Sequence, residues 1–513
     1  MVAALTALSR VLGLVREMFQ SRLIGAGVEQ SAFTLAFALP NMARKLFGEG
    51  ALTAAFVPVF KGSVETDGLA EAAKLARAVM TMVLLILFAV TALACAGLLG
   101  ALAMSSADPG SVWHLALSPR ARLTCELVAI LVPYMLAICG AAFGMGVLNS
   151  LGRFKAAGFM PALLNILWIA ALAVLVFFPG LSVASRIRFV SAAILVGGFA
   201  QFAFMLACMA ECGVRPWPSF SGWGTEKVRL VWRNLGIAAL GAGAIQINYA
   251  LDQVLAQIAA PWAAGVIGYA ERLMDLPLGV VGVAFGTVLL PTFAGAFAKD
   301  DVEAARAALA DSVRNMMFVM LPAAAGLAVI APLVVEVIYQ GGDFDAAATV
   351  RVARALAVYA VGLGFFAIQK SLVPWFQAQN DMKTPLRTTT VCVCVNAALN
   401  LAAVFALPVE WRHVGLAAST VVCAALGTFI LVRCGIRKNG SLGLSATLLP
   451  LGKMLLASLC MAAAVFAADR LLVGLNRYFR LALDLSVGAA VYFAAAVVVL
   501  RLPMVSLRRR RRA

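Results

Sequence analysis

The stretch Thr6–Gln20, TALSRVLGLVREMFQ, combines an apolar composition with one charged helical face. At about 100° per residue, its polar and small residues fall within about a third of the circumference, and large apolar residues fill the rest. Arg10 and Arg16 share the polar face. A guanidinium at the centre of a bilayer costs about 3 kcal/mol even on the mildest scale. If this helix spans a membrane, both arginines must therefore face a protein interior or a hydrated cavity.

The composition of the whole chain indicates a polytopic membrane protein. Of its 513 residues, 63% are hydrophobic and only 13% are charged, and the mean hydropathy is +0.96. These values lie far from those of soluble domains. The net charge of +17 does not indicate a nucleic-acid partner, because the basic residues sit in short loops and in the terminal run Arg508–Arg512. We interpret them as topology signals.

Several classes of enzyme and metalloprotein are disfavoured by the sequence. The ten cysteines include no CxxC pair, and the only histidines are His114 and His413, so neither a disulfide framework nor a metal site is expected. No arrangement of residues suggests a nucleophile, and no glycine-rich loop matches a Walker A motif. The chain is therefore predicted to be a transporter rather than an enzyme, with no cofactor.

Apolar runs long enough to cross a bilayer occur throughout the chain. We predict an all-α protein with fourteen transmembrane helices, at residues 3–24, 31–60, 77–104, 123–150, 157–179, 188–211, 230–258, 262–297, 314–339, 350–377, 385–407, 413–433, 447–468 and 481–502. Alternate loops carry the excess of lysine and arginine, which places both termini in the cytoplasm. The N-terminus lacks the features of a cleaved secretory signal, so the first helix is expected to be retained.

An internal duplication organises the spans. FALPNMARKLFGEGALTAAFVP in the second span resembles MDLPLGVVGVAFGTVLLP in the eighth, and RFKAAGFMPALLN resembles NDMKTPLRTTTVCVCVN. The offsets are about 230 residues, which predicts six spans repeated once as parallel halves, although a coincidence of prolines would give the same pattern. We expect lobes at 1–211 and 225–438 around a central cavity, two extra helices at 447–502 and a basic cytoplasmic tail at 503–513.

Charged residues recur in corresponding helices of the two halves. Arg44, Lys45 and Glu49 follow Pro40 in the second span. In the eighth span one face carries Glu271, Arg272 and Asp275 together with Gly268, Gly279, Gly282 and Gly286. Guanidinium groups bind phosphate oxygens in pairs and stay charged when buried. A cavity lined by Arg10, Arg16, Arg44, Lys45 and Arg272 therefore predicts an anionic substrate, such as a phosphate or diphosphate. For Glu17, Glu49, Glu271 and Asp275, ligand contact and salt bridges between lobes are equal alternatives.

A second polar group forms a candidate cation site. The seventh span contains Gln246, Asn248, Asp252 and Gln257, the eleventh Asn396 and Asn400, and the twelfth Ser419 and Thr420. Asp252, Asn396, Asn400 and Thr420 offer the oxygen ligands that Na⁺ prefers, or a proton site, and either ion could drive transport. Polar pairs that hold membrane helices together are the alternative. Lys370, in the tenth span, is a further buried charge without an evident partner.

Three motifs resemble the lipid II flippases of the MurJ (MviN) family, in the multidrug/oligosaccharidyl-lipid/polysaccharide exporter (MOP) superfamily. They are SRVLGLVRE at 9–17, FALPNMARKLFGEGALTAAFVP at 37–58 and YAERLMDLPLGVVGVAFGTVLLP at 269–291, and the resemblance extends over essentially the whole chain, including QNDMKTP and the two C-terminal helices.

This resemblance implies an inner-membrane flippase that moves the undecaprenyl-diphosphate-linked peptidoglycan precursor from the cytoplasmic to the periplasmic leaflet. It implies that Arg10, Arg16, Arg44, Arg272 and Glu49 are cavity residues. Ser31 stands where the family often has an acid, which affects the expected gate. Membrane lipids and peptidoglycan synthesis enzymes are further expected partners, and Na⁺, H⁺ or the membrane potential are candidate energy sources. A flippase for another polyprenyl-diphosphate glycan and a cation-coupled multidrug antiporter of the superfamily are the alternative functions.

Overall fold

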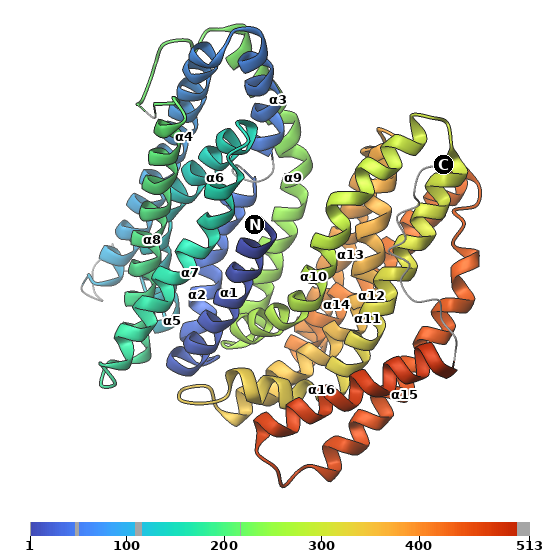
Figure 1. The fold of residues 1–513 in the computed structure, drawn as a ribbon. Coiled ribbons are helices and arrows are strands. Elements are labelled where there is room, and N and C mark those ends of the chain that lie inside the picture. The colour runs from blue at the N-terminus through green and yellow to red at the C-terminus, as the bar shows by residue number, and fades with distance from the viewer. Residues whose placement is uncertain (1, 47–50, 108–114, 216, 500–513) are drawn as a thin grey trace. The chain divides into compact units, whose positions relative to one another are not determined.

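The computed structural model describes the chain except for residues 1, 47–50, 108–114, 216 and 500–513, and some further side chains inside helices. The described chain is entirely helical apart from short connections (Figure 1). Its elements are α1 Val2–Ile24, α2 Val28–Ala43, α3 Ala51–Thr66, α4 Leu69–Ser105, α5 Pro119–Leu131, α6 Tyr134–Ser150, α7 Phe154–Val176, α8 Val183–Glu211, α9 Glu226–Ala259, α10 Ala263–Phe297, α11 Val302–Tyr339, α12 Ala346–Ala378, α13 Lys383–Ala406, α14 Val409–Asn439, α15 Ser445–Leu471, α16 Arg477–Phe493 and the π-helical η2 Ala494–Val499.

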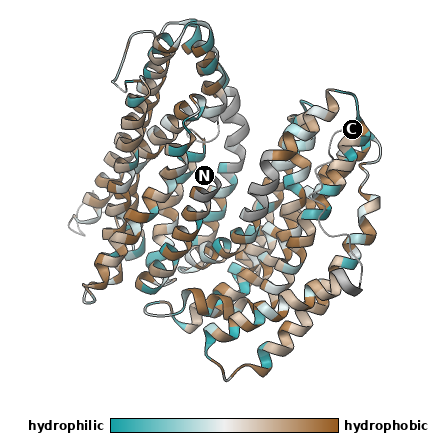
Figure 2. Ribbon diagram, viewed as in Figure 1, coloured by the Kyte–Doolittle hydropathy of each residue, from teal (hydrophilic) through white to brown (hydrophobic). Residues whose placement is uncertain are grey.

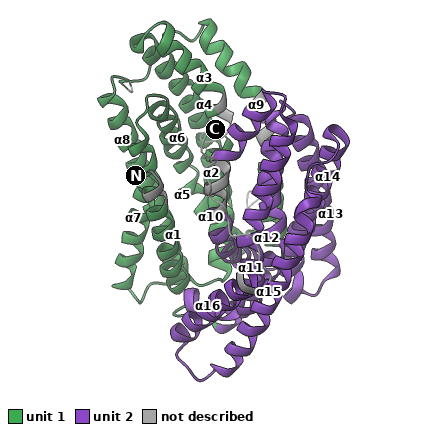
Figure 3. Ribbon diagram, turned by 45° about the vertical axis from the view of Figure 1, so that its right-hand side comes forward, with its two compact units in different colours: residues 1–257, 341–345 green, residues 258–340, 346–513 purple. Residues whose placement is uncertain are grey.

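The helices form two compact units, shown in different colours in Figure 3. Unit 1 comprises Met1–Gln257 and the short segment Gly341–Asp345, and unit 2 comprises Ile258–Gln340 and Ala346–Ala513. Helix α9, which the predicted duplication would assign to the second half of the chain, is grouped with unit 1 up to Gln257.

Within the described residues, ten segments are long and apolar enough to span a membrane: α4, α5 with α6, α7, α8 and α11 to α16, the last extending to Ala496. Apolar residues cover most of these helices (Figure 2). The prediction of an all-α, polytopic membrane protein is confirmed, while the total of fourteen spans stays a prediction. Helix α1 falls outside the ten because four ionisable residues lie between positions 10 and 22, and α2 and α3 have 16 residues each, fewer than the roughly 20 that a span requires.

One predicted span is interrupted rather than continuous. The predicted span 123–150 consists of α5 and α6, which are separated at Val132 and Pro133. Proline cannot donate a backbone hydrogen bond, and its ring clashes with the preceding helical turn. The predicted span 31–60 contains α2 and α3, and residues 47–50 between them lie outside the described part of the chain.

Unit 1 is built on close helix contacts and a cluster of aromatic rings. A Cβ added at Gly198 of α8 would lie 2.2 Å from the ring of Tyr134 in α6, so only glycine allows this approach. Phe33 and Phe37 of α2 stack on each other and meet Trp168 of α7 edge-on, with ring centroids 5.8 and 5.6 Å from it. This aromatic cluster fixes Trp168, whose ring lies against the guanidinium of Arg16.

A short segment between α11 and α12 packs against the α1–α2 turn. The backbone N–H of Asp343 donates to the carbonyl oxygen of Arg22 at 2.9 Å, and Arg186 of α8 forms an ion pair with Asp343 at 2.7 Å. Gly25 and Gly342 have φ angles of +75° and +55°, and an added Cβ would lie 2.4 and 2.2 Å from backbone oxygens. The contact therefore requires glycine at both positions.

Unit 2 has α11 and α12 at its centre. Helix α12 packs against α10, α11 and α14, and α11 also packs against α15. Trp375 of α12 is fully buried and meets Phe293 and Phe297 of α10 edge-on, at 5.5 and 5.0 Å between ring centroids. Helix α11 is kinked at Ile330, whose φ and ψ are −97° and 15°, two residues before Pro332. Proline there disturbs the preceding turn.

Candidate functional site

Arg16 is held at the junction of α1 and α7 by three different contacts. Its Nη1 donates to Oδ1 of Asn165 at 2.9 Å, its Nη2 forms an ion pair with Glu17, and its guanidinium carbon lies 4.2 Å from the ring centroid of Trp168. The Arg16 and Glu17 side chains are 11% and 12% exposed. A planar guanidinium can hydrogen-bond in its plane and stack through its face at the same time, so Arg16 has a fixed orientation.

One donor of Arg16 is not used in this arrangement. Its Nε is buried and has no hydrogen-bond partner in the described part of the chain. Nε and Nη2 form one edge of the guanidinium, the edge that binds two oxygens of a carboxylate or phosphate. Glu17 contacts Nη2 on that edge. Arg16 therefore has one N–H left that can donate to a further anionic oxygen, while its contacts with Asn165 and Trp168 are kept.

Asn165 is a site residue that sequence reasoning missed. Its Nδ2 donates to the backbone carbonyl of Ser9 at 3.0 Å, while its Oδ1 accepts from Arg16. The side chain thus connects α7 to two turns of α1. The sequence signal was present, because an uncharged amide lies within an otherwise apolar span, but amides in spans are common helix-packing residues.

The other predicted cationic residues of unit 1 lie on α1 and after α2. Arg10 is exposed on α1. Arg44 follows the last residue of α2, and its Nε and Nη2 both donate to Oδ1 of Asn41, at 3.2 and 2.9 Å. Lys45 Nζ lies 5.0 Å from the ring centroid of Tyr249 on α9. Glu49 lies outside the described residues.

In unit 2, α10 presents the predicted charged residues on its accessible side. Arg272 and Asp275 are exposed and Glu271 is half-buried, whereas Leu273 and Met274 are buried. Oε1 of Glu271 accepts a hydrogen bond from the Tyr359 hydroxyl at 3.3 Å. Side chains at 280–287, including the predicted glycine positions Gly282 and Gly286, lie outside the description. Since Arg272 belongs to unit 2, its convergence with the arginines of unit 1 stays a prediction.

Ser31 occupies a buried position in unit 1. Its carbonyl oxygen accepts from Nε2 of Gln257 at 2.6 Å, and Arg120 donates to the backbone oxygen of Gln257 at 2.8 Å and to its side-chain oxygen. Gln257 therefore connects α2, α5 and α9. Sequence reasoning placed Gln257 among polar residues of a cation site, and this connecting role was missed.

The candidate cation site divides between the two units. In unit 1, Nδ2 of Asn248 donates to Oδ2 of Asp252 at 3.1 Å. In unit 2, Asn396 and Asn400 are buried, Ser419 donates to Oδ1 of Asn400, and the Thr420 hydroxyl donates to the Leu416 carbonyl at 3.2 Å. The shared cation site stays a prediction. Among the described residues, no group of three His, Cys, Asp or Glu residues could hold a metal ion. Lys370 is exposed on α12, so its interpretation as a buried charge was wrong.

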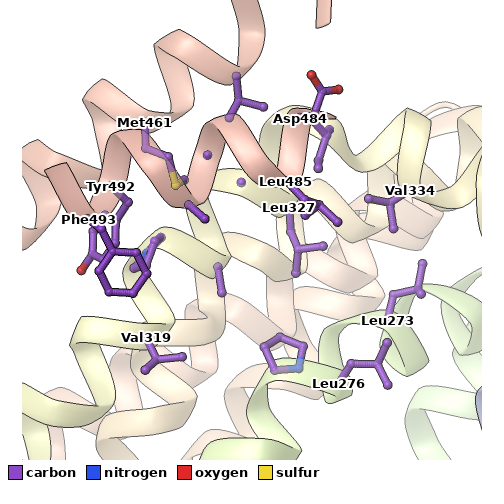
Figure 4. Close-up of a pocket in the computed structure, with 18 of the residues that line it drawn as sticks. Leu273, Leu276, Val319, Leu327, Val334, Met461, Asp484, Leu485, Tyr492 and Phe493 are labelled. Carbon is purple, nitrogen blue, oxygen red and sulfur yellow. The ribbon is translucent and has the colours of Figure 1, made fainter. Parts of the chain in front are cut away.

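Unit 2 also contains an apolar groove of about 480 Å³ between α10, α11, α15 and α16 (Figure 4). Leu273 and Leu276 come from α10, Val319 and Leu327 from α11, and Met461 from α15. Helix α16 contributes Leu485, Tyr492, Phe493 and a single carboxyl group, that of Asp484. The shape and lining suit an apolar chain rather than a polar headgroup.

Comparisons with known proteins agree on one family. The family model described as "Lipid II flippase MurJ" matches residues 20–504. A "Probable lipid II flippase MurJ" of Rhizobium tropici is 33% identical over 406 residues, which cover 78% of this chain and 74% of that protein. A solved structure described as "Lipid II flippase MurJ, inward closed conformation" has a TM-score of 0.78 at 21% identity and covers 98% of both chains.

The fold is also similar to that of a multidrug resistance MATE family transporter of the MOP superfamily in an inward-facing conformation. The TM-score is 0.67 at 16% identity, with 84% of this chain and 96% of that chain covered.

Proposed function

The chain belongs to the MurJ family of lipid II flippases, and on this basis we propose that it moves lipid II from the cytoplasmic to the periplasmic leaflet of the bacterial inner membrane. Family membership makes the protein a transporter rather than an enzyme, as the sequence predicts. The headgroup of such a lipid carries a diphosphate and sugars, which cannot cross hydrocarbon unaided. Transport therefore requires a hydrated, cationic path.

Arg16 carries the mechanistic part of the proposal. Its buried, unused Nε and its Nη2 form an edge suited to two phosphate oxygens. A diphosphate that displaces Glu17 from Nη2 would gain both donors, while Asn165 and Trp168 keep the guanidinium in position. Glu17 thus acts as a substitute anion in the absence of substrate, which lowers the cost of burying the charge. Release of the diphosphate is favoured when Glu17 returns.

The remaining elements complete an alternating-access cycle. The lobes 1–211 and 225–438 would enclose a central cavity lined by Arg10, Arg16, Arg44, Lys45, Glu49 and Arg272, and rock about it. Glu271, Asp275 and Ser31 would support its gates. The apolar groove, formed in part by the helices within 447–502, would take the isoprenoid tail.

Topology and energy coupling complete the proposal. Both termini would lie in the cytoplasm, with fourteen spans in all. Either Na⁺ or H⁺ bound near Asp252, Asn396, Asn400 and Thr420, or the membrane potential, would drive the cycle. Surrounding membrane lipids and peptidoglycan synthesis enzymes are the proposed partners.

Complementation of a strain depleted of its own flippase tests the proposal. Arg16→Ala and Arg272→Ala should each fail to support growth and should reduce the lipid precursor accessible on the outer leaflet, with near-normal amounts of folded protein. Arg229→Ala, at an exposed position on α9, is the matched control and should complement. If the Arg16 and Arg272 variants instead lose folded protein in parallel with growth, these residues are structural bridges and the cavity proposal is wrong.

Substrate identity is tested separately by crosslinking from the position of Arg10, which is exposed on α1. Recovery of a diphosphate lipid carrying the peptidoglycan disaccharide supports the proposal. Recovery of a diphosphate lipid with other sugars would instead assign the protein to another glycan.

A further inference from the structure

Asp484 is a buried carboxyl group that the transport mechanism does not use. It lies on α16 and is 1% exposed, and neither of its oxygens has a hydrogen-bond partner among the described residues. It is one of the residues that line the apolar groove, and Figure 4 shows it beside Leu485. The other residues of the groove named above are apolar apart from the Tyr492 hydroxyl, which donates to the Phe318 carbonyl at 2.8 Å.

Among the residues that the structure describes, no arginine or lysine is paired with Asp484. Arg480, one turn earlier on α16, donates through Nε to Oδ1 of Asp469 on α15 at 2.6 Å. Arg477 lies 4.0 Å from Glu336 of α11. Asp469 and Arg480 are the charged groups that act on Asp484, and Arg480 also lies within range of Glu336. Helix α10 contributes only apolar side chains to the groove. Three acids thus share two arginines, and both arginines are already paired.

An ionised carboxylate in this position would be unstable. Transfer of an isolated charge into an apolar environment costs many kcal/mol, and the group neutralises instead where it can. A second negative charge near Asp469 adds repulsion. We propose that Asp484 is a proton-binding site that takes up a proton at mildly acid pH and thereby keeps the groove uncharged. This inference does not depend on the identity of the transported lipid.

Protonation makes Asp484 a target for a specific chemical class, the hydrophobic carbodiimides. The carboxyl O–H adds across one C=N bond of the reagent: the carboxyl oxygen bonds to the central carbon, and the nitrogen takes the proton. The resulting O-acylisourea rearranges by oxygen-to-nitrogen acyl migration to a stable N-acylurea, so no atom is lost and no oxidant or reductant is needed. A reagent that partitions into lipid reaches the groove, whereas a water-soluble carbodiimide does not.

The test is labelling of the full chain in lipid nanodiscs with dicyclohexylcarbodiimide, followed by peptide mass spectrometry. At about pH 6, Asp484 should be the main labelled carboxyl group, and Asp484→Asn should abolish the label without lowering the thermal unfolding midpoint. Glu303, whose side chain is 80% exposed, is the internal control: it should react with the water-soluble carbodiimide and mark correctly folded protein.

Asp469→Asn provides the sharper comparison. It releases Arg480 from its present partner, so Arg480 can turn to Asp484 and favour the ionised form. At about pH 6, labelling of Asp484 should then fall about fivefold, because a pKa near this pH moves about one unit below it. The proposal is overturned if folded wild-type protein is not labelled at Asp484 by the hydrophobic reagent. It is also overturned if the water-soluble reagent labels Asp484 as readily as Glu303, or if Asp469→Asn leaves the labelling unchanged.

Discussion

Asn165 positions Arg16 by hydrogen bonds at both ends of its amide, accepting from Nη1 at 2.9 Å and donating to the Ser9 carbonyl at 3.0 Å. One amide thus fixes both the backbone of α1 and its charged side chain. Asn165 carries no charge, so we expect it to influence transport only through the position of Arg16.

We expect Asn165→Leu to lower the transport rate about tenfold while the protein still inserts and folds. A hydrogen bond to a charged group contributes about 1.5–3 kcal/mol, and a guanidinium that swings away no longer presents its Nε–Nη2 edge. The measurement is precursor flipping in reconstituted vesicles, beside Asn149→Leu at an exposed position on α6. Equal activity of the two variants would show that the hydrogen bond from Arg16 to Asn165 is not needed for transport.

Gly25→Ala and Gly342→Ala should each lower the thermal unfolding midpoint and expose the segment 341–345 to protease. Alanine at these φ angles costs roughly 1–2 kcal/mol, and the added Cβ atoms would lie 2.4 and 2.2 Å from backbone oxygens. Gly180→Ala is the control, because nothing lies within 4 Å of an added Cβ there. A midpoint unchanged from that control would contradict the described packing of the segment.

The Asp381 carboxyl group should make stability depend on acid pH. Burial alone would raise its pKa, but hydrogen bonds from the Thr384 backbone, from Lys438 and from the Thr384 hydroxyl outweigh burial and lower the pKa to about 2. A lowered pKa stabilises the fold above the unfolded value of about 3.9, and this contribution is lost as the pH falls toward the folded value. The contribution at neutral pH is on the order of 1–2 kcal/mol.

Thermal unfolding of wild type and Asp381→Asn at several acid pH values measures this effect. The stability difference between the two proteins should be largest near neutral pH and should shrink between about pH 4 and about pH 2. Parallel curves over that range would exclude Asp381 as the responsible group.

Replacing either of two glutamines on α9 by leucine should affect the stability of the protein differently. Gln257→Leu removes the donor to the Ser31 carbonyl and a partner of Arg120, so we expect a loss of about 1–3 kcal/mol. Gln253, one turn earlier, is buried, and its Oε1 has no hydrogen-bond partner among the residues whose positions are described. Gln253→Leu should therefore be neutral or stabilising. Unfolding in denaturing detergent measures both, and losses of similar size would show that Gln257 has no special connecting role.

The sequence predicts those features that depend on local periodicity. The polar face of α1, including Arg16 and Glu17, follows directly from residue spacing, and the family motifs around Arg44 and Arg272 identify the chain. The break at Pro133 was missed because the flanking residues continue the apolar run, so hydropathy gives one span where two helices lie. Whether a proline breaks a membrane helix depends on how neighbouring helices satisfy the backbone groups that it leaves without a hydrogen bond.

Features that depend on contacts distant in sequence could not be predicted. Asn165 and Gln257 act through partners 149 and 226 residues away, and neither residue differs locally from other amides in membrane helices. Asp484 has no described ion-pair partner because Arg480 pairs with Asp469 and Arg477 lies near Glu336. These pairs depend on the packing of α11, α15 and α16, which the sequence does not show. The QNDMKTP motif helped to indicate the family. The hydrogen bonds of its Asp381 with Thr384 and Lys438 became evident only with the fold.

The distance along the chain between Arg16 and Asn165 has a consequence for biogenesis. Ribosomal synthesis at about 5–20 residues per second separates the emergence of α1 from that of α7 by on the order of ten seconds. During that interval the guanidinium of Arg16 has Glu17 but not its α7 partner. Helix α1 should therefore remain at the insertion machinery or at the membrane–water interface, and should enter the lipid fully only after α7 has been synthesised.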